Sequence, residues 1–147
     1  MNHYRFRSTW LVAGRPDRVF DVLGDLATYP QWWPEVRSIR QIDDVTAGAV
    51  IRAFLPYSLH LVMRQVVKDR QTGELKVSLG GDLEGYSRFL IEPRDAGCVL
   101  HYRQEVVARK RLLRMLAPIA RPLFSVNHLI MMKRGNRGLT RYLEEVR

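Results

Sequence analysis

The stretch Pro16–Pro34 reads PDRVFDVLGDLATYPQWWP and decides how this chain folds. Pro16 suits the first turn of a helix, where a missing N–H costs no hydrogen bond. Tyr29-Pro30 predicts a break, and Trp32 and Trp33 follow it directly. Each tryptophan is a large rigid group with one donor, so the pair suits either a packed core or the mouth of a pocket. The helix before the break has an apolar stripe at helical spacing, made by Val19, Phe20, Val22, Leu23 and Leu26.

Alternating residues on both sides of this stretch predict strands. His3–Ala13 alternates in the way that is typical of a half-buried strand. After Pro34, turn signals at Asp43-Asp44 with Thr46-Ala47-Gly48, and at Asp69–Gly73, separate further short runs. Short strands joined by turns predict an antiparallel meander. The predicted strands are Val36–Ile42, Ala49–Leu55, Leu59–Lys68, Leu75–Leu79, Tyr86–Pro93 and Val99–Val107.

The sequence period changes to a helical one after Ala108. Apolar residues from Leu112 to Ala120 recur at helical spacing, and Pro118 and Pro122 interrupt them. Leu123–Glu145 then predicts one helix about 34 Å long, at roughly 1.5 Å per residue. One stripe of this helix contains Phe124, Asn127, Met131, Gly135, Gly138 and Tyr142.

The predicted fold class is α+β. A curved antiparallel sheet of about seven strands would wrap on the long C-terminal helix, with two short helices after the first strand. We expect residues 1–147 to form a single domain. One helix does not fill the concave face of such a sheet, so a cavity is expected between the two.

Composition and charge exclude several classes of protein. The 147 residues carry a net charge of +9, and no uncharged stretch is long enough to cross a bilayer. The first residues lack the apolar core of a signal peptide. Cys98, the single cysteine, can form neither an internal disulfide nor a multi-cysteine metal site. We therefore expect a cytoplasmic protein without a metal or cofactor.

Positive charge is concentrated at the C-terminal end. Residues 109–147 carry ten Lys or Arg and two Asp or Glu, a net charge of +8. Either the charge is a solvated face, or Arg109, Lys110, Arg111 and Arg114 contact an anionic membrane at its periphery. Nucleic acid is the less favoured partner, because the GxxG spacing of residues 135–138 falls within a helical pattern. Both a monomer and a homodimer remain open.

Several short motifs occur in a characteristic order along the chain. They are Ala13, Pro16, Val19-Phe20, Asp25, Tyr29-Pro30, Trp32-Trp33-Pro34, Gly97, Asn127-His128, Met131 and Gly135-x-x-Gly138-Leu139. With this layout the chain resembles the START-related (SRPBCC) superfamily, which has the helix-grip fold, over essentially its whole length. It looks most like the polyketide cyclase/dehydrase branch. That resemblance implies a cavity for an apolar or aromatic small molecule, such as a lipid or a polyketide.

Strand alternation predicts which side chains face this cavity. If Arg52, Arg64, Arg88 and Arg103 face water, their neighbours in the same strands face inward. The predicted walls, with the tryptophans at the mouth and two residues from the helix, are Trp32, Trp33, Leu55, Leu61, Met63, Leu79, Phe89, Tyr102, Gln104, Asn127 and Met131.

The candidates for catalysis are few. Tyr102 and His128 are the candidate groups for proton transfer, with Asp25 and Glu35 as further titratable groups. His128 lies beside the predicted apolar stripe, and no predicted inward residue of the strands is a carboxylate. The sequence also lacks phosphate-binding, dinucleotide-binding, zinc-protease and serine-hydrolase motifs.

Three functions follow from these patterns. The first is binding of an apolar small molecule. The second is a polyketide cyclase or dehydratase activity. The third is a basic adaptor that contacts a membrane quinone or lipid, or RNA. Polar donors without an evident base favour the first.

Overall fold

The protein forms one curved sheet with its helices on the concave side. The computed structural model describes residues 3–52, 58–109 and 120–145. In this part of the chain, seven antiparallel strands follow the order β1-β7-β6-β5-β4-β3-β2. The elements are β1 (His3–Val12), α1 (Pro16–Leu23), η1 (Leu26–Thr28), α2 (Tyr29–Trp32), β2 (Val36–Gln41), β3 (Thr46–Ile51), β4 (Leu59–Asp69), β5 (Glu74–Gly81), β6 (Leu83–Arg94), β7 (Gly97–Ala108) and α4 (Ala120–Glu145). The predicted fold class is confirmed.

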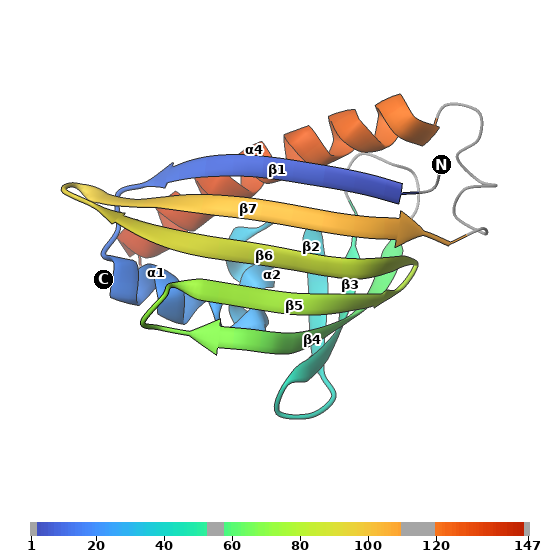
Figure 1. The fold of residues 1–147 in the computed structure, drawn as a ribbon, viewed down its shortest axis with the longest axis horizontal. Helices are drawn as coiled ribbons and strands as arrows, with labels where there is room; N and C mark the ends of the chain where they lie inside the picture. The colour runs from blue at the N-terminus through green and yellow to red at the C-terminus, as the bar shows by residue number, and fades with distance from the viewer. Residues whose placement is uncertain (1–2, 53–57, 110–119, 146–147) are drawn as a thin grey trace.

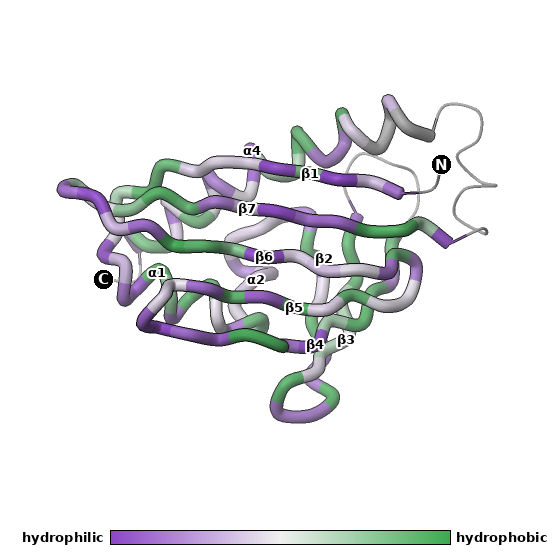
Figure 2. The backbone as a smooth tube through the Cα atoms, viewed as in Figure 1, coloured by the Kyte–Doolittle hydropathy of each residue, from purple (hydrophilic) through white to green (hydrophobic). Residues whose placement is uncertain are grey.

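The sheet curls strongly around the helices. β2 and β3 pass behind β5 and β6 in the view of Figure 1, and α1, α2 and α4 lie together on that side. Figure 2 shows hydrophilic and hydrophobic residues interspersed along the strands, as expected of a sheet with one wet face. The buried residues of β1, β6 and β7 include Trp10, Phe89 and Leu100, which form a core with the helices.

The segment that connects β1 to β2 differs from its prediction in one respect. α1 starts at Pro16 and ends at Leu23, and the Asp25 side chain caps η1 by accepting from the Ala27 N–H at 3.2 Å. The predicted break at Tyr29-Pro30 is wrong, because α2 begins there. A proline in the first turn needs no N–H partner, so it starts this helix instead of ending one.

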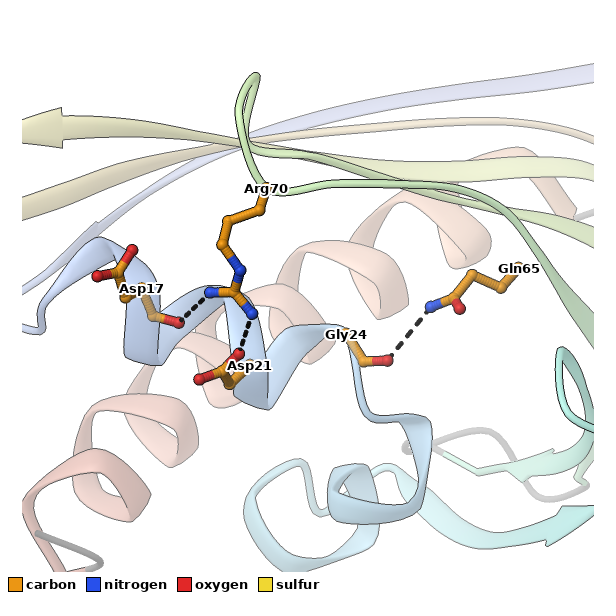
Figure 3. A network of polar contacts seen from close by, with 5 residues as sticks. All are labelled: Asp17, Asp21, Gly24, Gln65 and Arg70. Atoms are coloured by element: carbon orange, nitrogen blue, oxygen red, sulfur yellow. Dashed lines mark hydrogen bonds and ion pairs between the residues drawn. The ribbon is translucent and has the colours of Figure 1, made fainter.

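Two side chains, Arg70 and Gln65, tie α1 and the residue after it to the sheet side through three contacts, as Figure 3 shows. The Arg70 guanidinium lies 2.5 Å from the Asp21 carboxylate and 3.4 Å from the Asp17 carbonyl oxygen. Gln65, in β4, donates to the Gly24 carbonyl oxygen at 3.2 Å, just after α1 ends. The Arg70 pair is exposed and contributes little, but the Gln65 bond is partly buried and fixes the end of α1.

The strand boundaries near β3 also differ from the prediction. Thr46-Ala47-Gly48 was expected to be a turn, but these residues begin β3. The bend lies in the earlier part of the predicted turn, at Asp43-Asp44, where the Asp43 side chain accepts from the Val45 N–H at 2.9 Å. Asp is a strong turn former because its side chain replaces backbone partners, and this local bond outweighs the glycine signal. The end of the predicted strand, residues 53–55, lies outside the described residues.

Glycines let α4 approach the rest of the molecule closely. A Cβ on Gly135 would lie 2.7 Å from Cε2 of Trp33 and 2.9 Å from Cη2 of Trp10. The Trp33 indole N–H also donates to the Met131 carbonyl oxygen at 2.9 Å. The helix includes Ala120 and Pro122, so it extends before the predicted start at Leu123. The predicted helical residues 112–119 lie outside the described part of the chain.

Candidate functional site

A small cavity lies between the sheet and the helices. Its volume is about 110 Å³, and its walls are mainly aliphatic and aromatic. The predicted wall residues that line it are Trp33, Leu61, Met63, Leu79, Phe89, Tyr102, Gln104, Asn127 and Met131. The wall also includes Phe6, Tyr29, Val77, Ser87 and His128, which were not in the predicted set.

One predicted wall residue, Trp32, does not line the cavity, although it is only 3% exposed. Its indole N–H donates to Thr28 Oγ1 at 3.2 Å, and the residue lines a separate groove beside Arg137. Consecutive helical residues point about 100° apart, so only Trp33 of the pair faces inward. Both tryptophans are buried, so neither forms the exposed mouth of the cavity that the sequence predicted. Leu55, another predicted wall residue, lies outside the described residues.

A polar cluster projects from β6, β7 and α4 into the apolar wall. The Tyr102 hydroxyl lies 2.5 Å from Gln104 Oε1 and 3.0 Å from the Ser87 hydroxyl. His128 Nε2 lies 3.1 Å from the same Gln104 oxygen. A carbonyl oxygen only accepts, so Tyr102 and His128 both donate to it. This arrangement assigns the proton of His128 to Nε2 and leaves Nδ1 as an acceptor.

Burial keeps this cluster uncharged. Desolvation lowers the pKa of His128 to about 4, so its imidazole is neutral at pH 7. Burial raises the pKa of Tyr102 well above its usual range, so its phenol stays protonated. The Phe6 ring stacks on the His128 ring with 3.8 Å between the ring centres, so the imidazole is held within the cavity wall. The cluster therefore offers neutral donors and acceptors.

The position of His128 corrects the sequence-based expectation. The helical spacing of apolar residues predicts His128 beside the apolar stripe of α4, whereas the structure places it in the cavity wall with Asn127 and Met131. The rotation of α4 is set by the close approach at Gly135 and Gly138, which a stripe of apolar residues alone does not specify. One sequence signal could have predicted this position. His128 lies four residues before the apolar Met132, so the two share one face of the helix, and Met132 is buried.

The carboxylates considered for catalysis lie elsewhere. Asp25 caps η1 and does not line the cavity. Glu35 is buried, and its Oε2 lies 2.8 Å from Arg134 Nε, which ties the start of β2 to α4. Glu35 does not line the cavity either, and no carboxylate does so among the described residues.

The basic segment is only partly described. Arg109 forms an ion pair with Glu84 at 2.7 Å, which offsets its charge. Lys110, Arg111 and Arg114 lie outside the described residues. Within the described part of the chain, no helix is both long enough and apolar enough to cross a membrane.

A curved sheet that grips a long helix around a small apolar cavity is the helix-grip arrangement of the START-related (SRPBCC) superfamily. The chain is similar to the Zhui aromatase/cyclase from Streptomyces sp. R1128, with 15% identity, a TM-score of 0.78, and 97% and 93% of the two chains covered. It is also similar to a START superfamily protein from Mycobacterium smegmatis, with 16% identity, a TM-score of 0.73 and 99% coverage of both chains. Identities this low establish the fold alone.

A third similar structure is norcoclaurine synthase from Thalictrum flavum in complex with dopamine and hydroxybenzaldehyde. It has 17% identity, a TM-score of 0.67, and covers 99% of this chain and 88% of its own. A comparison with curated proteins finds no match. The model of the family described as polyketide cyclase / dehydrase and lipid transport matches residues 3–144. The chain belongs to this family.

Proposed function

We propose that the protein binds an apolar or aromatic small molecule in the cavity between the sheet and α4. The observation that carries this proposal is the uncharged cluster of Tyr102, Gln104 and His128 within an otherwise apolar wall. Ligand sites combine apolar walls with a few placed polar groups that fix orientation. A hydroxyl or carbonyl on the ligand would bind at this cluster.

The size of the cavity limits the group that enters it. Its volume of about 110 Å³ is close to that of an engineered apolar cavity of about 150 Å³ that holds benzene. A single ring or a short branched chain therefore fits. Larger ligands require the wall to repack, and Met63 and Met131 are suited to this because methionine side chains adapt readily.

Cyclase or dehydratase chemistry is the second candidate. It is supported by the family description and by the similarity to an aromatase/cyclase. In this alternative Tyr102 would donate a proton and the unprotonated Nδ1 of His128 would accept one. A base is most effective when its pKa is near the working pH, and the pKa of His128 is about 4. Binding is therefore the function that the site supports better.

Peripheral membrane contact through the outward side of α4 is a further proposal. Val126, Leu129 and Ile130 are exposed on α4, although large aliphatic side chains usually pack inside. They form the outward side of the helix whose inward side contributes Asn127 and Met131 to the cavity. An apolar ligand would then leave the cavity close to a lipid surface.

Native mass spectrometry followed by organic extraction tests the binding proposal. We expect a reproducible small apolar adduct on the wild type. Val77→Phe places a ring in the cavity wall and should abolish the adduct. Val62→Phe makes the same change on the exposed side of β4 and should preserve it. An adduct that survives Val77→Phe, or a protein that stays empty with lipid and polyketide panels, would overturn the proposal.

A further inference from the structure

Asn127, on α4, has a buried acceptor that no described residue satisfies. The residue is 8% exposed, and its Oδ1 has no hydrogen-bond partner among the described residues. It also lines the cavity. Buried polar atoms in folded proteins are nearly always paired, so an unpaired acceptor in a cavity wall points to a donor supplied from outside the chain.

The other buried oxygen without a partner in the described structure has a different setting. It is Oε1 of Glu35, whose second carboxylate oxygen binds Arg134. Glu35 does not line the cavity, so a ligand there does not reach it. Asn127 is therefore the residue whose unpaired atom concerns the binding site.

The wall determines the charge that a ligand can carry. Lys76 is the charged residue among the described wall residues, but its ammonium lies 4.6 Å from the centre of the Tyr86 ring. Tyr86 bonds to the partly exposed Glu105, outside the cavity. A carboxylate or phosphate would therefore find no opposite charge inside, and a buried unpaired charge is strongly disfavoured.

We infer that the ligand of this cavity is neutral and carries a hydroxyl or N–H group that donates to Asn127 Oδ1, as a phenol does. The inference rests on the proposed binding function and names the chemistry of its ligand. Asn127 accepts from the ligand, while the neighbouring cluster of Tyr102, Gln104 and His128 orients a second polar group. The volume of about 110 Å³ matches a single substituted ring.

Isothermal titration calorimetry with phenol, toluene and anisole tests this inference. The measured quantity is the ratio of the toluene Kd to the phenol Kd, which removes the effects that both rings share. Asn127→Leu has a similar volume and no acceptor, and it should lower this ratio about tenfold. Toluene should bind the variant at least as tightly as the wild type. Asn136→Leu changes another asparagine of α4 that does not line the cavity and should leave the ratio unchanged.

Each outcome separates the inference from the proposed function. Toluene binding with an unchanged ratio in Asn127→Leu overturns the inference and leaves cavity binding intact. If neither toluene nor phenol binds the wild type, both fail. The wild type alone gives a second test that needs no variant. Phenol should bind more tightly than anisole, which has an extra methyl group but no donor, and the reverse order overturns the inference.

Discussion

Gly138 on α4 lies directly against the backbone of Trp32. A Cβ at Gly138 would be 1.6 Å from the carbonyl oxygen of Trp32, well inside any tolerated contact. Because glycine has no side chain, the backbone of α4 can contact the backbone of α2 at this position. The contact also sets how α4 is rotated over the cavity, because a larger residue would push the helix outward.

Gly138→Ala should destabilise the protein by about 3 kcal/mol or more, because its methyl group overlaps a backbone atom that cannot rotate away. Urea denaturation followed by circular dichroism measures this loss. Gly80→Ala is the matched control, since a Cβ at Gly80 meets no atom within 4 Å. Equal stabilities of the two variants would contradict the proposed role of Gly138.

Stability should depend on pH through His128. Its ordinary pKa is 6.5, and its pKa in the folded protein is about 4. Between these values the unfolded chain binds more protons than the folded one, so the free energy of unfolding falls as the pH is lowered. The loss amounts to about 3 kcal/mol at pH 4 and below.

His128→Gln should flatten this dependence between pH 6.5 and 4, because glutamine does not titrate. Urea midpoints measured across this range provide the test. His60→Gln changes an exposed histidine outside the cavity and should keep the slope of the wild type. A slope that persists in His128→Gln would show that another group carries it.

Tyr102→Phe should distinguish binding from turnover. It removes one donor from the cluster, so ligand affinity should fall about fivefold, equivalent to about 1 kcal/mol. An enzyme that uses Tyr102 as its acid should lose turnover while binding is largely kept. Tyr86→Phe removes a hydroxyl bound to Glu105, outside the cavity, and should change neither quantity.

The exposed side of α4 should bind anionic membranes. Leu129→Ser together with Ile130→Ser should reduce sedimentation with phosphatidylserine vesicles about tenfold, because two partly exposed aliphatic side chains would no longer enter the lipid. Leu11→Ser removes a 74% exposed leucine of β1 and is the control. Sedimentation that is equal for both variants, or absent for the wild type, would exclude α4 as the membrane contact.

The sequence predicts the inward faces of the strands well. Phe89, Tyr102 and Gln104 line the cavity as the alternation around Arg88 and Arg103 requires. Alternation has a period of two residues, so one outward arginine fixes its neighbours. The run of neighbouring strands from β2 to β7 follows from turns and short strands, whereas the sequence pattern does not predict that β1 lies beside β7. The superfamily resemblance is confirmed.

The helical part of the site is harder to predict. Trp32 and Trp33 are adjacent in sequence, but only Trp33 of the two lines the cavity. His128, predicted to lie beside the apolar stripe of the helix, lies in the cavity wall. The rotation of a helix depends on contacts with distant residues, such as that of Gly135 with Trp10. The unpaired oxygen of Asn127 is a property of its three-dimensional surroundings, so no sequence pattern reveals it.

The order of the strands also affects how the chain folds during synthesis. In the described sheet β7 is the one strand beside β1, and His3 pairs with Val107. A ribosome adds about 5 to 20 residues per second, so β1 is made about 5 to 20 s before its neighbour is complete. During that time its apolar face, with Tyr4, Trp10 and Val12, has no strand to lie against. The nascent chain therefore exposes an apolar segment to which a chaperone can bind until β7 is made.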